Sequence, residues 1–430
     1  MILTRAAALR AVAGVLASAA LAACGAAPPV AVAPPTALGP SAFNPSGPDA
    51  AIYGLTPEGF PRADQVTWWQ VPYLVDSHSR LDEIFLAHRV DKAPTPRPLR
   101  RAATEPAIAY RAQEEDRTLD GYLARHPATG FLLVKDDRIL VERYQYDRRD
   151  TQRFTSWSMA KTVTSMLVGI AIDEGRIRSI DDRPSEYVPA LAGTAYGATP
   201  IRHLLTMSSG VHFTEDYSGR DDVAQLVADT FRGVGPGGPA AVTAYNARDA
   251  APGTRFAYAS SETQVLGLVL RAAVGRSVAA YLSEKIWQPM GAEADASWLI
   301  DRTGQESTYC CLNAVLRDYA RLGLLLANDG RVGDRQVIPK AWLAAATTVP
   351  SESAYLAPRT ATPYFGYGYQ TWIFPGDERM FALLGLRGQA IYVDPASKLV
   401  LVHTAVRRLP DPSIVELGAL WAGIRRQLAS

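Results

Sequence analysis

Several well-known catalytic patterns are missing from this sequence of 430 residues. It has no Gly-x-Ser-x-Gly turn, no His-Glu-x-x-His helix, no glycine-rich phosphate loop and no Cys-x-x-Cys pair. Its six histidines are scattered, without the spacing of metal ligands. These absences argue against a metal site and against an ordinary Ser-His-Asp hydrolase. We therefore expect no metal and no cofactor.

The net charge of the chain is small, and it has few cysteines. The 44 basic and 43 acidic residues leave a formal charge of +1, which gives no reason to expect a nucleic-acid partner. Of the three cysteines, Cys310 and Cys311 are adjacent, and neighbouring residues rarely meet disulfide geometry. We expect these two to be small buried apolar side chains, and a redox or metal role is the alternative.

The first 24 residues have the pattern of an export signal. Arg5 and Arg10 precede an apolar run, 11–23, that is too short to span a bilayer. The run ends in Leu21-Ala22-Ala23-Cys24-Gly25, which resembles the lipobox of bacterial lipoproteins. This resemblance implies a signal peptide over 1–23, lipidation of Cys24 and anchoring to a membrane on the periplasmic side, the outer membrane being favoured over the inner. The alternative is an ordinary signal peptide in which Cys24 is incidental.

The rest of the chain divides by composition. Residues 24–50 are rich in Pro and Ala and predict an extended tether. Residues 51–117 form an N-terminal extension of unassigned role, and 118–430 form the main domain, with a mainly helical insertion at about 176–300. The predicted strands of this domain are 131–134, 139–141, 367–373, 380–384, 390–393 and 399–404, and its long helices are 159–174 and 413–427. Strands at both ends with helices between them predict one α+β domain.

A serine and a lysine stand at the start of a long apolar segment, in Ser158-Met159-Ala160-Lys161. Residues three apart lie on one face of a helix, so Ser158 and Lys161 would be neighbours. The helix N-terminus also offers backbone N–H groups that can stabilise the anion of a tetrahedral intermediate. Burial would lower the pKa of Lys161 and let its amine accept a proton. The alternative is a serine that caps the helix, followed by a solvated lysine.

Two further segments could complete such a site. Tyr258 lies in Tyr258-Ala259-Ser260, just before a predicted helix. Beside a lysine ammonium, we expect its pKa to fall from about 10 toward the working pH, which suits a general base. Residues 385–389 join two late strands, and their glycines would let the backbone approach a bound acyl group. The N–H of Gln389, next to Gly388, is the candidate oxyanion donor. The alternatives are a core tyrosine and a plain hairpin turn.

The order of these elements resembles the β-lactamase-related serine hydrolases, which include class C β-lactamases, penicillin-binding DD-peptidases and esterases. It is similar above all to the 6-aminohexanoate-dimer hydrolase branch. The segments that carry the resemblance, within about 118–425, are Ser156–Thr162 (SWSMAKT), Ile201–Gly210 (IRHLLTMSSG), Ile286–Gly291 (IWQPMG) and Gly385–Gln389 (GLRGQ) followed by Ile391–Pro395 (IYVDP). The resemblance implies a β-lactamase/transpeptidase-like fold, in which an antiparallel sheet is flanked by helices.

The resemblance also implies roles for individual residues. Ser158 would be the nucleophile, Lys161 its activator, and Tyr258 the general base and acid. In the dimer-hydrolase branch a second tyrosine binds the substrate amide, and Tyr217 falls about where that residue would. The alternative is that Tyr217 only packs its loop.

This sequence departs from the penicillin-recognising members at two places. Those members carry Lys-Thr-Gly or His-Thr-Gly where this chain has Leu386-Arg387-Gly388, so the cation that steadies a β-lactam carboxylate is missing at Leu386. The middle motif ends in Ser260, a candidate substrate-binding residue, where lactamases commonly have asparagine. Both departures argue against efficient β-lactam hydrolysis.

The sequence therefore predicts a serine hydrolase that cleaves a small ester or amide through an acyl-enzyme on Ser158. One alternative is a DD-peptidase or β-lactamase. The other is a catalytically silent lipoprotein that uses the fold for binding. The expected partners are a small-molecule substrate and, through the lipid anchor, a membrane.

Overall fold

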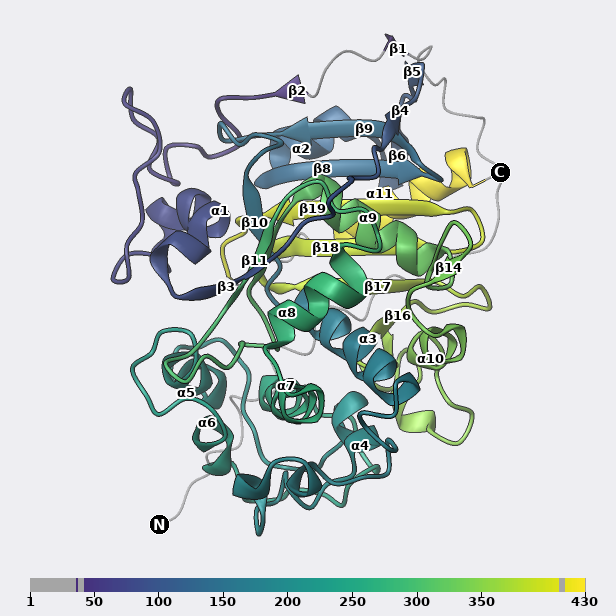
Figure 1. Ribbon diagram of the computed structural model, residues 1–430. Coiled ribbons are helices and arrows are strands. Elements are labelled where there is room, and N and C mark those ends of the chain that lie inside the picture. Colours follow the sequence, from purple (N-terminus) through teal and green to yellow (C-terminus); the bar gives the residue numbers. More distant parts are fainter. Residues whose placement is uncertain (1–35, 38–41, 410–413, 430) are drawn as a thin grey trace, which may run out of the picture.

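The computed structural model describes residues 36–37, 42–409 and 414–429. Its central feature is a sheet with the strand order β15-β16-β17-β18-β19-β8-β9-β2, in which β4 also pairs with β9 (Figure 1). These strands are β15 (Gly366–Tyr367), β16 (Trp372–Ile373), β17 (Phe381–Gly385), β18 (Gln389–Asp394), β19 (Leu399–Ala405), β8 (Ala128–Lys135), β9 (Arg138–Tyr144), β2 (Ala42–Phe43) and β4 (Arg100–Arg101). The run from β15 to β9 is antiparallel, so the early hairpin and the late strands form one sheet, as the sequence predicts.

Two predictions about this sheet were wrong. The segment 367–373 is two short strands that pair with each other, because the chain turns at Gln370, which has a left-handed φ of 56°. The end of the predicted tether also has structure, since β2 runs parallel to β9. The backbone groups of β9 that face away from β8 remain open to such pairing. The predicted signal peptide and Cys24 lie outside the described residues.

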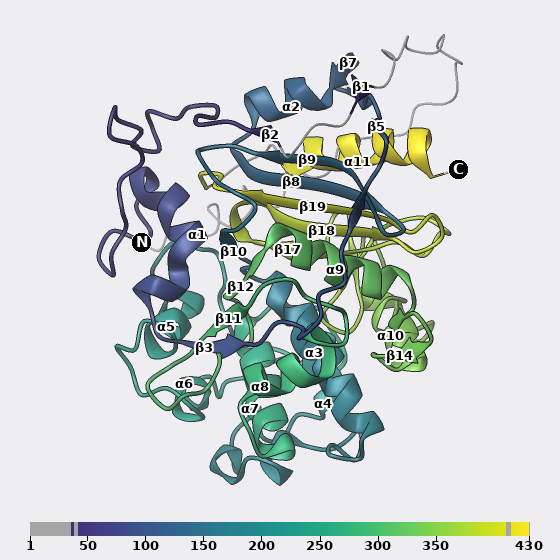
Figure 2. The ribbon, with the colours of Figure 1, turned by 45° about the horizontal axis from the view of Figure 1, so that its top comes forward.

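Helices cover both faces of the sheet (Figure 2). One face packs against α2 (Leu119–Arg125) and α11 (Ile414–Leu428), where Trp421 meets Tyr392 with ring centroids 5.8 Å apart. The other face packs against α3 (Met159–Asp173) and α9 (Leu316–Ala327). Most of α3 is buried, as its apolar sequence predicts, and the sheet on one side and α7 (Ser260–Val274) on the other cover it.

The segment predicted as a helical insertion contains no strand from residue 176 until β11 (Ala296–Leu299) within the described chain. Its helices are α4 (Ile201–Leu205), α5 (Asp222–Asp229), α6 (Ala240–Thr243), α7, α8 (Val278–Leu282) and the π-helical turn Ser283–Trp287. Across the described residues, no single helix is long and apolar enough to cross a bilayer; only the pair Ser260–Val274 and Val278–Trp287 passes that test jointly, with a bend of 75°.

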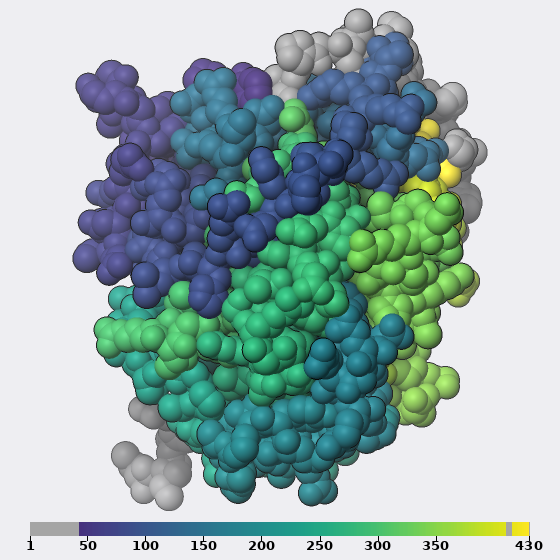
Figure 3. Space-filling view, in the orientation of Figure 1, coloured from purple at the N-terminus to yellow at the C-terminus, as the bar shows by residue number. Residues whose placement is uncertain are grey.

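A second sheet ties the N-terminal extension to the main body. Its order is β10-β12-β11-β3, all antiparallel, from β10 (Arg153–Thr155), β12 (Leu312–Val315), β11 and β3 (Ala87–Val90). The extension thus supplies an edge strand, and its helix α1 (Leu74–Ile84) packs beside β10. Figure 3 shows the extension lying across the surface of the body. Because β10 leads directly to Ser158, this sheet positions the candidate nucleophile.

The remaining elements are short. The strands are β1 (Thr36–Ala37), β5 (Thr104–Glu105), β6 (Ala109–Ala112), β7 (Glu115–Thr118), β13 (Arg331–Val332) and β14 (Arg335–Gln336), and the helices are α10 (Lys340–Ala346) and the 3-10 turns Val71–Tyr73, Pro184–Glu186, Pro189–Leu191, Ala354–Leu356 and Leu386–Gly388.

Candidate active site

Ser158 and Lys161 lie together at the start of α3. Ser158 occupies the N-cap position, and the Lys161 Nζ lies 2.9 Å from the Ser158 Oγ. The i, i+3 spacing in a helix produces this contact, as the sequence predicts. Ser158 is half-buried, whereas Lys161 is only 1% exposed.

The Lys161 amine has three polar neighbours. Besides Ser158, the Ser260 Oγ and the Tyr309 carbonyl oxygen each lie 3.0 Å from Nζ. Burial lowers the pKa of Lys161 to about 8, against the opposing effect of the Glu215 carboxylate. A neutral amine donates two hydrogen bonds and accepts one. Lys161 can therefore donate to Ser260 and Tyr309 while its lone pair accepts the Ser158 proton.

Tyr258 lies beside the pair but does not have the predicted pKa. Its ring centroid is 4.9 Å from the Lys161 Nζ, and it stacks on Trp372 at 5.4 Å. Enclosure of its hydroxyl and the nearby Glu215 carboxylate raise the pKa of Tyr258 well above 10, and a hydrogen bond with Ser158 lowers it by less. The expectation of a lowered pKa for Tyr258 was wrong, because desolvation and the Glu215 charge outweigh the hydrogen bond with Ser158. Tyr258 is a phenol in this site and hence a proton donor.

Glu215 is a site residue that sequence reasoning did not single out. Its carboxylate accepts hydrogen bonds from the Ser260 Oγ at 2.9 Å, the Ser260 N–H at 2.8 Å and the Tyr217 hydroxyl at 2.8 Å. Tyr217, 39% exposed, thus lines the site, and enclosure of its hydroxyl and Glu215 keep its pKa well above the ordinary value. The sequence carried only the weak signal that Glu215 lies two residues before Tyr217.

The strand turn after β17 approaches the segment that carries Ser158 through its first residues. A Cβ atom on Gly385 would lie 2.3 Å from the Ser156 carbonyl oxygen, so glycine is required for this close approach. Leu386 lines both cavities that meet at Ser158. Gln389 lines neither, and its side-chain amide is bound to the Leu386 and Ala405 carbonyl oxygens and the Ala405 N–H. The structure therefore brings Gly388 to the cavity wall but does not bring Gln389.

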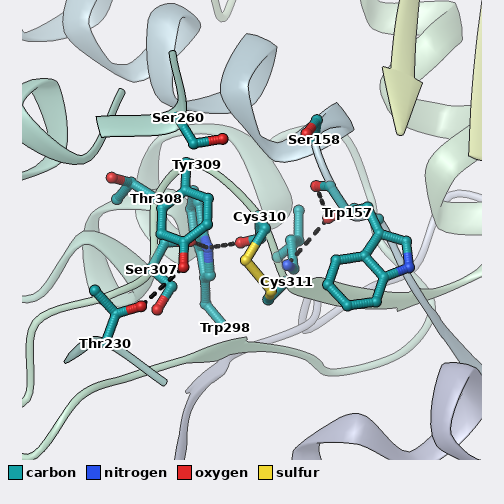
Figure 4. The surroundings of a disulfide bond; sticks show 12 residues. Trp157, Ser158, Thr230, Ser260, Trp298, Ser307, Thr308, Tyr309, Cys310 and Cys311 are labelled. Atoms are coloured by element: carbon teal, nitrogen blue, oxygen red, sulfur yellow. Dashed lines mark hydrogen bonds between the residues drawn. A yellow bond between two sulfur atoms is a disulfide. The ribbon is translucent and has the colours of Figure 1, made fainter. Parts of the chain in front are cut away.

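Cys310 and Cys311 form a disulfide, which corrects the prediction of two unlinked apolar side chains. Cys311 has a left-handed φ of 69°, and this uncommon conformation turns the adjacent side chains toward each other. The pair lies next to Tyr309, Ser260 and Ser158 (Figure 4). The indole N–H of Trp298 donates to the Cys310 carbonyl at 2.8 Å. The disulfide thus stiffens the segment whose Tyr309 carbonyl contacts Lys161.

Several non-glycine residues with left-handed backbone conformations lie at this site. Trp157, Tyr217, Cys311 and Arg387 all have left-handed φ values, between 43° and 69°. Such conformations cost energy in residues other than glycine and cluster where the surrounding fold enforces them for function. Trp157 directly precedes Ser158, so the turn that presents the serine is itself strained.

Two cavities meet at Ser158. The first has a volume of about 310 Å³ and the second about 320 Å³. Both are bounded by Ser158, Glu215, Tyr217 and Leu386. Tyr258, Trp372, Leu384, Gly385, Arg387 and Gly388 line only the first, whereas Ser260, Tyr309 and Cys310 line only the second. Residues of the segment 211–252 contribute to both cavities, and none of 350–365 lines either.

Ser158 lies against the desolvated Lys161, between the central sheet and the helical layer. This arrangement is that of a serine hydrolase with a β-lactamase fold. The comparisons agree: the family model described as Beta-lactamase matches residues 116–421, and the chain belongs to that family. The 6-aminohexanoate-dimer hydrolase of Paenarthrobacter ureafaciens is 26% identical over 388 residues, which are 88% of this chain and 96% of that protein.

Solved structures support the same fold. A structure described as a 6-aminohexanoate-dimer hydrolase from Bacillus anthracis superposes with a TM-score of 0.75 at 24% identity, covering 87% of this chain and 97% of that one. A penicillin-binding protein homologue from Caulobacter crescentus superposes with a TM-score of 0.52 at 18% identity, covering 69% and 93%. The predicted fold class and family resemblance are thereby confirmed.

Proposed function

We propose that this protein hydrolyses a small ester or amide through an acyl-enzyme on Ser158. The contact between Ser158 and the buried Lys161, whose pKa is about 8, carries the proposal. The curated relative, whose name describes hydrolysis of a 6-aminohexanoate dimer, adds support for an amide or a related ester.

In the first half-reaction, the neutral Lys161 amine takes the Ser158 proton while Oγ forms a bond to the substrate carbonyl carbon. The backbone N–H groups of Ser158 and Leu386 stabilise the oxyanion; Leu386 takes the place of Gln389 because it lines both cavities. Collapse of the intermediate breaks the bond to the leaving group, which takes the Tyr258 phenol proton. The Lys161 ammonium then returns its proton to Tyr258.

In the second half-reaction, water attacks the acyl-enzyme. Lys161 accepts a proton from the water, the ester bond to Ser158 breaks, and Oγ recovers that proton from the Lys161 ammonium as the acid leaves. Glu215 holds Ser260 and Tyr217 in place around the amine. The chemistry requires no cofactor.

Intact mass spectrometry after mixing with 4-nitrophenyl acetate tests the proposal. We expect one acetyl adduct that forms and decays in the wild type and is absent in Ser158→Ala. Ser351→Ala, which removes an exposed serine far along the chain, is the matched control and should behave as wild type. An adduct of equal yield in Ser158→Ala would refute the nucleophile, and no adduct at all would favour the silent binder.

The β-lactam alternative has one observation in its favour. Arg387 and Arg407 both line the first cavity beside Ser158, where a cation could hold a carboxylate. A labelled penicillin that acylates Ser158 would support it. Attachment through Cys24 stays a prediction, and palmitate incorporation that is lost in Cys24→Ala would test it.

A further inference from the structure

Three tryptophans form one wall of the second cavity. Trp68 and Trp69 come from the N-terminal extension, and Trp157 precedes the nucleophile. Their ring centroids lie 5.0 Å apart for Trp68 and Trp69, 5.5 Å for Trp69 and Trp157, and 6.2 Å for Trp68 and Trp157. Trp68 and Trp157 are buried, whereas Trp69 is half-buried. The wall is thus a rigid aromatic surface in which Trp69 is the most accessible.

The rest of the lining is also largely apolar. It contains Val223, Ala224 and Val227 of α5, and the disulfide reaches it through Cys310. The acids in the lining are already engaged: Glu215 with Ser260 and Tyr217, and Asp221 with backbone N–H groups including that of Ala224. Such a slot gains most from an apolar or aromatic group that fills it and stacks on the indoles.

Tyr258 determines which part of a substrate enters each cavity. It lines the first cavity and not the second. A proton donor must lie within hydrogen-bond reach of the atom that it protonates. The leaving group therefore departs into the first cavity, and the acyl group extends from the carbonyl carbon into the second.

We propose that the tryptophan-lined cavity binds the acyl part of the substrate and selects an aromatic or bulky apolar acyl group over a small one. The inference rests on the proposed function and deepens it by naming the substrate class. It also assigns a role to the N-terminal extension, which supplies two of the three indoles. Trp69 is a specificity-determining residue in this scheme, and it does not take part in bond making.

The test compares two esters with the same leaving group, 4-nitrophenyl phenylacetate and 4-nitrophenyl acetate. We expect the wild type to have the larger kcat/KM for the phenylacetyl ester. Trp69→Ala should reduce that value about tenfold or more, the usual range for lost contacts in an apolar pocket. The same variant should change kcat/KM for the acetyl ester less than about threefold. Ala224→Phe, which fills the same cavity from α5, should produce the same selective loss. Leu409→Ala, in the lining of the first cavity only, is the control and should leave the ratio unchanged.

The outcomes separate the two proposals. If 4-nitrophenyl acetate does not acylate Ser158, the proposed function fails. If it does, but both variants reduce kcat/KM for the two esters equally, only the acyl-pocket inference fails. The same holds if the wild type has the larger kcat/KM for the acetyl ester. If Trp69→Ala does not fold, Ala224→Phe decides alone. In a second pair of substrates, acetyl esters of a small and a bulky alcohol, a rate that depends on Trp69 through the alcohol would reverse the assignment of the cavities and overturn the inference.

Discussion

The rate of acylation should depend on pH through Lys161. Burial lowers the pKa of its ammonium to about 8, and only the neutral amine can accept the Ser158 proton. With this pKa, about 1% of the amine is neutral at pH 6 and about half at pH 8. We therefore expect kcat/KM to rise about 50-fold between these two values and to level off above about pH 9.

The assay is the initial rate of 4-nitrophenyl acetate hydrolysis, followed at the isosbestic wavelength of nitrophenol, with the Ser158→Ala rate subtracted at each pH. A profile that is flat from about pH 6 to 9 would refute Lys161 as the proton acceptor. So would a rise that continues toward 10.5, the ordinary value for lysine, because the amine would then be unperturbed.

Glu215→Gln supplies the directional check. The Glu215 carboxylate raises the pKa of Lys161, so removal of its charge should move the acid limb of the profile to lower pH. Lost hydrogen bonds to Ser260 lower the plateau as well, so the position of the limb, and not its height, reports the charge. Asp216→Asn neutralises the neighbouring acid, which is exposed, and should leave the limb in place. No shift, or a shift to higher pH, would contradict the electrostatic argument.

Two further predictions concern the same lysine and the disulfide. Lys161→Met should abolish turnover yet raise the free energy of unfolding by up to about 3 kcal/mol at pH 7, because the depressed pKa of the buried amine costs stability in the wild type. That cost is fully present below about pH 8 and disappears as pH rises toward 10.5. The free energies of unfolding of the two proteins, measured by urea titration, should therefore differ at low pH and converge at high pH. Equal stability of the two proteins at pH 7 would contradict this prediction. A phosphine that reduces the Cys310–Cys311 disulfide, and is itself oxidised as two thiols form, should lower kcat several-fold. Loss of the disulfide should weaken the hydrogen bond between the Lys161 amine and the Tyr309 carbonyl oxygen. The Cys310→Ala/Cys311→Ala variant should not respond to the phosphine, and complete reduction, verified by mass, with an unchanged kcat would disprove the link.

Local patterns in the sequence led to the candidate catalytic pair and to most elements of the fold. The i, i+3 spacing of Ser158 and Lys161 at the start of an apolar helix determines their contact wherever that helix packs. The alternation of apolar runs and turns placed β8, β9, β17, β18 and β19 nearly at their observed bounds. The ordered motifs added the family, which the comparisons confirm.

Contacts between distant segments decided the rest. Whether Tyr258 or Lys161 has the lowered pKa depends on desolvation and on Glu215, which the fold brings to Ser260 from another loop. The approach of Leu386 in place of Gln389 depends on how closely Gly385 packs against Ser156. Adjacency argued against a Cys310–Cys311 bond, but the left-handed backbone at Cys311 permits it. Local motifs determined the candidate chemistry of this chain. Only tertiary packing decided that the extension's tryptophans line a cavity at Ser158, because no local pattern encodes which surfaces meet.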